Sequence, residues 1–247
     1  FSAQKAGALT TEIGVGKHSS ALFTAVPAPD VRLDGRVRIN LKQVEKCAQV
    51  VKNLPEAEPF NFVCDFLPPV NHPNVLDYFF AVTLQQFSFW EDDGRTYTKP
   101  LLAQIDGKLL KGSSYLYQAY TRQLLKDPLF FTPERQVDVT VEELLSIFRA
   151  DDGSDPMPAF DLHLQKTNQY GRDMLALGLT PEKIIARAYH LPTPLKTFIM
   201  ILDRIGGYKE DPIRKKANLL ATCLDARPEK IFQFRASEEV TPVVDYH

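Results

Sequence analysis

Apolar residues recur every three to four positions along most of the chain, which is the spacing of helices that bury one face. Leu41, Val44, Cys47 and Val51 follow this spacing, and the Asn53-Leu54-Pro55 sequence then breaks it. The pattern predicts one amphipathic helix that ends before the proline. The segment from Val75 to Phe89 is denser in apolar residues. It predicts a buried helix whose end projects aromatic side chains.

Helix starts are marked by residues that can bond to free backbone N–H groups. In Thr140-Val-Glu-Glu143 a hydroxyl precedes an acidic residue by three positions, which predicts a capping box with Leu144, Leu145 and Phe148 on the buried face of the helix. Thr180-Pro181-Glu182 predicts a second start of this kind. Further helices are predicted over Ser113–Lys126, Phe160–Leu177, Pro194–Ile205, Pro212–Leu224 and a short piece from Pro228.

One segment favours β structure. Residues 101–110 place Asp106-Gly107 between two short apolar runs, and Asp-Gly supplies the positive φ angles of a two-residue hairpin turn. The predicted fold class is therefore mainly α, a single helical fold with a small β hairpin. Residues 1–36 lack periodicity and are expected to form an irregular N-terminal arm, while residues 37–247 form the helical domain.

Composition narrows the class of partner. The 247 residues carry a formal net charge of -2 and a pI near 6.3, so the chain has no broad basic surface and nucleic acid is not an expected partner. A small anionic ligand in a local basic pocket is compatible with this balance. No apolar run reaches the roughly 18 residues of a membrane span, so no membrane partner is expected.

Cysteine and histidine usage points to neither disulfides nor metals. The three cysteines are Cys47, Cys64 and Cys223, and they are too scattered for a disulfide framework, which predicts a reduced, cytoplasmic protein. Neither His72 nor His163 has a partner at the spacing of metal ligands. We therefore expect no metal site.

Several residues allow a functional or a structural interpretation. Basic Arg214-Lys215-Lys216 could bind a phosphate or form a solvated helix face, and Asp161 could contact a base or ribose or cap its helix. Phe87 and Phe89 fit either a base-stacking surface or the core. Trp90 adjoins the polar run Glu91-Asp92-Asp93-Gly94 and is the preferred stacking candidate at a pocket edge.

Four blocks, in a fixed order, resemble the queuosine salvage family. They are Phe87-Ser88-Phe89-Trp90, Asp106-Gly107-Lys108, Ile147–Asp151 with Pro156-Met157-Pro158, and Val244-Asp245-Tyr246. The resemblance implies an enzyme that hydrolyses the N-glycosidic bond of queuosine 5'-phosphate, a small-molecule nucleotide, without a metal or organic cofactor. It also implies a fold similar to helix-hairpin-helix DNA glycosylases, with further helices after the Asp-Tyr motif, so a C-terminal part of the domain is expected to be missing from these residues.

The resemblance also implies roles for individual residues. Asp245 is expected to be the catalytic carboxylate, since cleaving the bond builds positive charge on the ribose C1'. Substrate-binding roles fall to Lys215, Arg214, Phe87, Phe89, Trp90, Asp161 and Tyr246. Thr83 and Cys223 stand where the family carries acidic residues. Two alternatives therefore remain open: a non-catalytic nucleotide-binding paralogue and a DNA base-excision glycosylase.

Overall fold

The fold is mainly α, as the sequence predicts, and is seen in a computed structural model that describes residues 40–55, 64–69, 71–94, 96–189, 193–211 and 213–225. The predicted arm over residues 1–36 and the piece from Pro228 lie outside the described residues. The helices are α3 (Leu41–Lys52), α4 (Val75–Thr83), α5 (Ser113–Lys126), α6 (Pro133–Gln136), α7 (Val141–Phe148), α8 (Phe160–Ala176), α9 (Pro181–Tyr189), α10 (Pro194–Leu202) and α11 (Lys215–Asp225).

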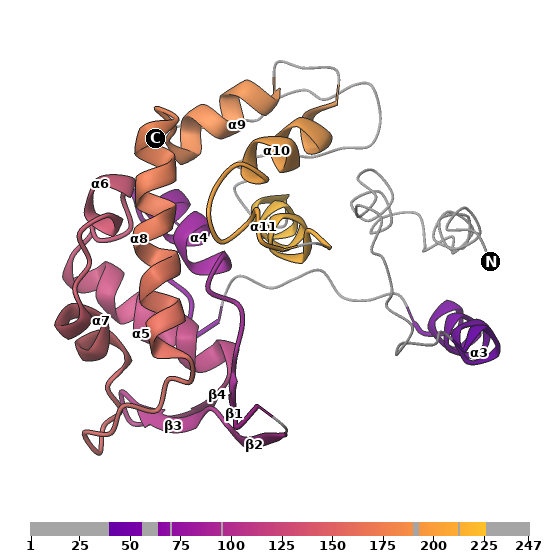
Figure 1. Ribbon diagram of the computed structural model, residues 1–247, viewed down its shortest axis with the longest axis horizontal. Coiled ribbons are helices and arrows are strands. Elements are labelled where there is room, and N and C mark those ends of the chain that lie inside the picture. Colours follow the sequence, from indigo (N-terminus) through magenta and orange to yellow (C-terminus); the bar gives the residue numbers. More distant parts are fainter. Residues whose placement is uncertain are drawn as a thin grey trace.

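The long helix α8 runs along the helical body, and α4 contacts α5, α9 and α11 (Figure 1). The short α4 is buried along nearly its whole length, with Tyr78, Phe80 and Val82 fully shielded from solvent. Helices α6 and α7 lie on one side of α8 in this view, α9 and α10 lie at one end of the body, and α11 lies beside α4. The phenol of Tyr208 donates to the Phe80 carbonyl oxygen at 2.6 Å and so ties the segment before α11 to α4.

Prediction and structure differ at the end of α4. The helix was expected to continue to Phe89, but it ends at Thr83 and residues 86–89 are irregular. Gln85 is buried, and its side chain bonds across to α8 instead of continuing the helix surface. The apolar pattern could not reveal this because the partner lies more than 75 positions along the chain.

The capping box before α7 is confirmed. The Thr140 hydroxyl accepts from the Glu143 N–H at 3.2 Å, and the Glu143 carboxylate accepts from the Thr140 N–H at 3.0 Å. Leu144 and Phe148 are buried as expected, but Leu145 is only half-buried and Ile147 takes its place on the buried face.

Two antiparallel hairpins lie at the end of the body opposite α9 (Figure 1). The predicted hairpin is confirmed as β3 (Leu102–Ile105) and β4 (Lys108–Lys111), joined by the Asp106-Gly107 turn. Its turn N–H groups both donate to the Asp151 carboxylate, at 3.0 and 2.8 Å. The second hairpin, β1 (Trp90–Asp92) with β2 (Tyr97–Pro100), was not predicted.

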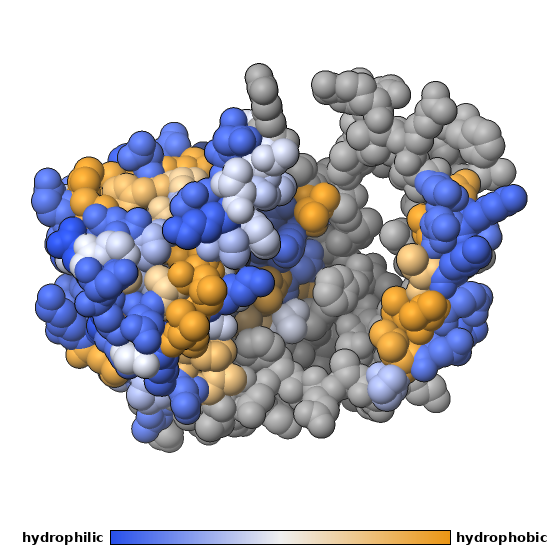
Figure 2. Space-filling model, turned by 90° about the horizontal axis from the view of Figure 1, so that it is seen from below, coloured by the Kyte–Doolittle hydropathy of each residue, from blue (hydrophilic) through white to orange (hydrophobic). Residues whose placement is uncertain are grey.

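Helix α3 is confirmed as an amphipathic helix, yet none of its residues is buried. Figure 2 shows its apolar and polar residues on separate sides of the segment at the right of the view. Its first turn is capped by Asn40, whose side-chain oxygen accepts from the Gln43 N–H at 3.3 Å.

One largely buried carboxyl, that of Asp77, is in an environment that disfavours its ionised form. Asp77 of α4 is mostly shielded, and burial, followed by the negative charges of Glu182 and Glu134, raises its pKa to about 7. The unfolded chain ionises Asp77 near its ordinary value of 3.8, so the folded state holds the proton more tightly. Ionisation of this carboxyl therefore destabilises the folded state. The loss of stability grows as pH rises from about 4 to 7 and reaches its full size above pH 7.

Replacing Asp77 with Asn is expected to stabilise the protein at pH 8 by about 1 to 3 kcal/mol, because the variant removes that ionisation cost. The gain should vanish near pH 4, where the carboxyl is neutral in both states. Urea denaturation at the two pH values measures it. Asp161→Asn is the control, because Asp161 also lies in the first turn of its helix but is exposed. A gain that is equal at both pH values would contradict the assignment.

Candidate functional site

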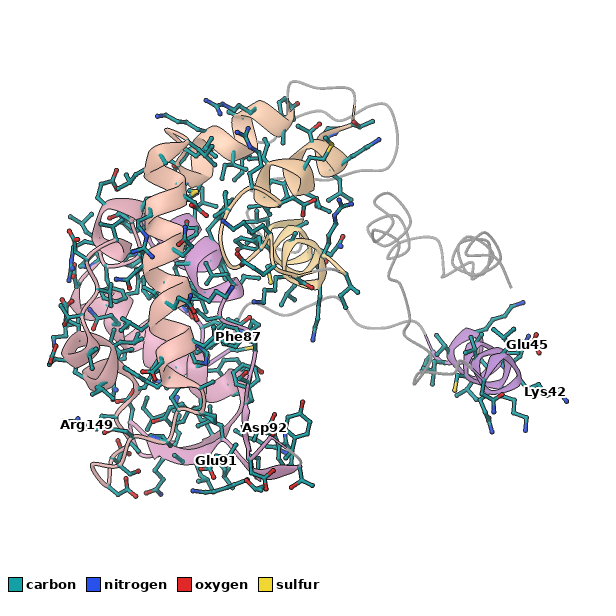
Figure 3. The ribbon with its side chains drawn as sticks, viewed as in Figure 1. Lys42, Glu45, Phe87, Glu91, Asp92 and Arg149 are labelled. Atoms are coloured by element: carbon teal, nitrogen blue, oxygen red, sulfur yellow. The ribbon has the colours of Figure 1, made fainter. Side chains whose placement is uncertain are left out.

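Phe87 is the centre of a cluster that joins the segment after α4 to α8 and α11. Its ring stacks on the imidazole of His163, with the two ring centres 4.2 Å apart and an angle of 13° between the planes. The Lys216 ammonium lies 4.6 Å from the centre of the Phe87 ring. Figure 3 marks Phe87 in the irregular segment that follows α4.

Lys216 is held by the start of α11. Its backbone N–H donates to the Asp211 carboxylate at 2.8 Å, which caps the helix. Its ammonium donates to the Gly207 carbonyl oxygen at 3.3 Å and forms no ion pair with any described residue. Burial lowers the pKa of Lys216 to about 8, while the negative charge of Asp211 acts in the opposite direction. This half-buried cation is therefore available to an anionic ligand.

His163 is fixed by a buried network with Gln85. The Gln85 amide nitrogen donates to Thr167 Oγ1 at 2.9 Å and lies 3.4 Å from the His163 carbonyl oxygen, which can only accept. The Gln85 oxygen consequently faces His163 Nδ1 at 2.8 Å, and Nδ1–H donates to it. Burial, and then the nearby Lys216, lowers the pKa of His163 to about 3, so the ring is neutral at physiological pH.

The three predicted basic residues occupy different environments. Arg214 has a φ of 54° and its guanidinium pairs with the Asp203 carboxylate at 2.7 Å, which joins the start of α11 to the end of α10. Lys215 is exposed. Lys216 contacts Phe87, so Lys216, and not the exposed Lys215, is the lysine beside the aromatic ring.

The remaining aromatic candidates are partly shielded. Phe89 is half-buried against the hairpins, and a Cβ added at Gly112 would lie 3.7 Å from its ring. Trp90 begins β1, is 43% exposed, and has the Lys111 ammonium 5.8 Å from its ring centre. Asp161 is exposed in the first turn of α8 and bonds to no described residue. These side chains do not join the Phe87 cluster.

Two predicted site residues, Asp245 and Tyr246, lie outside the described residues. Thr83 and Cys223, where the resemblance implies acidic residues, are both fully buried. Thr83 is 0% exposed and its hydroxyl has no partner among the described residues. Cys223 is 1% exposed, and burial raises the pKa of its thiol to about 12. Both positions therefore belong to the packed interior here.

A cleft among the described residues lies elsewhere. It has a volume of about 730 Å³ and runs between residues 64–71 and α5. Gln118 and Arg122 of α5 line it, and both bond to the Asp106 carboxylate, at 2.8 and 3.1 Å. None of the predicted site residues that the structure describes lines this cleft.

Sequence reasoning missed the part played by His163 and Gln85. His163 was considered only as a metal ligand, and Gln85 was taken for a residue of a continuing helix. The available signal was a polar pair, Gln85-Gln86, within an otherwise apolar and aromatic stretch. Polar side chains of this kind must either be exposed to solvent or form hydrogen bonds inside the protein. Gln85 bonds to His163 of α8.

Two further findings concern the described residues alone. No helix among them is long and apolar enough to cross a membrane. No group of three or more His, Cys, Asp or Glu side chains is arranged there to hold a metal ion.

Comparison with known proteins gives a match to one family model. The model is described as queuosine salvage protein, and it matches residues 67–204. The match covers more than half of the 247 residues and runs from the segment before α4 to the end of α10. It includes Phe87 and His163, while Lys216 and Asp245 lie beyond it. A search among curated proteins gives no match to this chain.

Proposed function

Because the chain belongs to the queuosine salvage protein family, we propose that it hydrolyses the N-glycosidic bond of a queuosine-type nucleoside 5'-phosphate. In this reaction the bond between the ribose C1' and the base nitrogen breaks, and the oxygen of a water molecule bonds to C1'. One proton of that water ends on the base nitrogen. The products are the free base, a 7-deazaguanine derivative that is available for salvage, and ribose 5-phosphate.

The observation that carries this proposal is the cation beside an aromatic ring at the Phe87 cluster. Lys216 lies against Phe87 without an ion pair to any described residue, and the neutral His163 stacks on the same ring. A nucleoside monophosphate offers a dianionic phosphate, which a cation binds, and a flat base, which an aromatic ring stacks on. Family membership supports a role in queuosine salvage, and this cluster supports the nucleotide as substrate.

The phosphate is proposed to bind at the start of α11. Arg214, Lys215 and Lys216 all lie there, and Lys216 is the one that lies beside Phe87, a proposed contact of the base. A helix N-terminus also favours anions, because its free N–H groups carry partial positive charge. Phe89, Trp90 and Asp161 remain proposed contacts for the base or ribose.

Asp245 is proposed to supply the carboxylate. Placed against C1', a carboxylate stabilises the positive charge that develops there and orients or deprotonates the attacking water. Tyr246 is proposed to line the same part of the site. This chemistry requires no metal or organic cofactor, because charge stabilisation and water activation both come from the side chain.

The direct test is incubation of the protein with queuosine 5'-phosphate and, separately, with guanosine 5'-phosphate, followed by chromatography of the released base. We expect queuine from the first substrate and no guanine from the second. Binding without release from either nucleotide would refute hydrolysis and indicate a non-catalytic nucleotide-binding protein.

Replacing Lys216 with Met is expected to raise KM for queuosine 5'-phosphate by about 30-fold, because a charged hydrogen bond to phosphate is worth about 2 kcal/mol. Lys215→Met should raise KM less, since Lys215 is exposed. Lys196→Met, on the exposed side of α10, is the control for loss of a positive charge.

The pH profile gives a second readout of the same residue. With a pKa of about 8, Lys216 loses its charge as pH rises through 8, so kcat/KM of the wild type should fall above that pH. Lys216→Arg keeps its charge to higher pH and should not show this fall. Equal effects of the Lys215 and Lys216 substitutions, with an unchanged pH profile, would reject the assignment.

A further inference from the structure

Residues 206–211 form a turn that precedes α11, and an ion pair fastens this turn to α8. The Lys166 ammonium of α8 donates to the Glu210 carboxylate at 2.8 Å. The same carboxylate oxygen accepts from the Gly207 N–H at 2.6 Å. Only 17% of the Lys166 side chain is exposed, so the pair is partly shielded from water, which strengthens a charged hydrogen bond. The Gly207 backbone is therefore held in place from α8.

The Gly207 carbonyl oxygen is the atom of this turn that contacts Lys216. It accepts from the Lys216 ammonium at 3.3 Å, and no other atom in the described part of the chain accepts from that ammonium. Gly207 is buried and has a φ of 91°, and an added Cβ would lie 3.1 Å from the Leu84 side chain. Glycine alone fits this conformation, which brings the carbonyl oxygen to Lys216.

A continuous set of contacts thus runs from α8 through the turn to α11. Its members, in order, are Lys166, Glu210, Gly207 and Lys216. A lysine side chain is flexible, so its ammonium stays in one place only where fixed partners hold it. Here the partners are the Phe87 ring and the Gly207 oxygen, which takes one of the three N–H groups. The other two are left for an anion.

We propose that Lys166 and Glu210 are positioning residues, which hold the Lys216 ammonium beside Phe87 through the Gly207 carbonyl oxygen. Neither side chain touches the substrate in this assignment. Each acts by fixing the place at which the phosphate meets the cation. This inference rests on the proposed function, because Lys216 is the phosphate-binding lysine of that site.

The ion pair also acts on the charge of Lys216, in two opposite directions. Burial is the largest influence and lowers the pKa of Lys216 to about 8. Among the nearby charges, those of Asp211 and Glu210 raise this pKa, while those of Lys166 and Lys215 lower it. Removing one member of the ion pair should therefore shift the pKa in the direction set by the partner that stays. The remaining groups on neighbouring elements are the neutral His163 of α8, the Asp203–Arg214 ion pair at the end of α10, and Asp77 of α4, whose charged neighbours are Glu182 and Glu134.

The first test is kinetic. Glu210→Gln and Lys166→Met should each raise KM for queuosine 5'-phosphate about 5-fold with kcat unchanged, because a displaced ammonium binds the phosphate less well. Lys166→Arg keeps the ion pair and should retain the wild-type KM within about 2-fold. In a Lys216→Met background, Glu210→Gln should change KM by less than about 2-fold, because a positioning residue acts only through the ammonium. An equal 5-fold effect in both backgrounds would overturn the proposal.

The second test needs no substrate and follows the Lys216 amine itself. An amine is acetylated by acetic anhydride only after it loses its proton, so the labelling of Lys216 over a pH series, read by mass spectrometry, gives its titration midpoint. Glu210→Gln should move the midpoint down by about half a pH unit, and Lys166→Met should move it up by about as much. The double variant should return it close to the wild-type value. A general loosening of the fold would instead expose the amine and raise the midpoint in both single variants.

Asp173→Asn is the matched control, because Asp173 fastens the same turn to α8 at a neighbouring point. Its carboxylate accepts from the Gly206 N–H at 2.7 Å and pairs with Lys209, but it bonds to neither Gly207 nor Lys216. The Lys216 midpoint should be the same in Asp173→Asn as in the wild type. A shift equal to that of Glu210→Gln would assign the effect to any anchor of the turn and would reject the specific role of the ion pair.

The outcomes separate this inference from the proposed function. Opposite midpoint shifts in the two single variants, together with a wild type that releases no queuine from queuosine 5'-phosphate, would refute hydrolysis alone. Release of queuine by the wild type, with KM and midpoint unchanged in Glu210→Gln and Lys166→Met, would refute the positioning role alone.

Discussion

Replacing Asp245 with Asn is expected to lower kcat for queuosine 5'-phosphate at least about 1,000-fold while KM changes by less than about 3-fold. Asn has nearly the shape of Asp but carries no negative charge and is a poor base. It therefore neither stabilises the developing positive charge on C1' nor deprotonates the attacking water. Quantified release of queuine measures kcat, and calorimetry with the free base measures whether the pocket persists.

The conservative variant Asp245→Glu refines this experiment. It keeps the charge but moves the carboxylate by one methylene, so a smaller loss of about 10- to 100-fold is expected if placement matters. Base binding should be unchanged in both variants. Turnover by Asp245→Asn at the wild-type rate would show that Asp245 is not the catalytic carboxylate. The prediction for Lys216 would be unaffected.

The helices were predictable where their determinants are local. The capping box at Thr140 and Glu143 is contained within four residues, and α5 has the predicted bounds. The β3–β4 hairpin follows for the same reason, because the Asp106-Gly107 turn fixes it. The hairpin of β1 and β2 was missed because all but one of its strand residues are exposed and therefore show no alternation. Its signal was the Asp92-Asp93-Gly94 sequence, in which Asp92 accepts from the Gly94 N–H at 2.8 Å.

The candidate site was predictable only in part, because its contacts join distant segments. The sequence pointed to Phe87 and to the basic start of α11, and the structure brings Phe87 and Lys216 together. The resemblance pointed to Lys215, whereas Lys216 is the lysine that lies beside Phe87, because which of two adjacent lysines faces inward depends on how α11 packs. His163 and Gln85 lie 78 positions apart, and no local pattern relates them.

Replacing Gly171 with Ala is expected to destabilise the protein by at least about 3 kcal/mol, although the same change in an exposed helix usually stabilises by up to about 1 kcal/mol. A Cβ at this position of α8 would lie 2.5 Å from the Val137 backbone nitrogen and 2.8 Å from the Pro133 carbonyl oxygen. Both are backbone atoms at α6, so no side chain can turn away to make room. Urea denaturation at pH 7 measures the loss.

Two hydrogen bonds hold α6 close to α8, so the α6 backbone cannot move away from an added Cβ without breaking them. The Asn168 amide donates to the carbonyl oxygens of Val137 and Val139, at 3.0 and 3.1 Å, and separation of the two helices would break both bonds. Arg172→Ala, on the exposed face next to Gly171, is the control and should change stability by no more than about 0.5 kcal/mol. If Gly171→Ala matched the wild type in urea, α6 could not lie against α8 as closely as described. The position of α8 bears on the site as well, because the same helix carries His163.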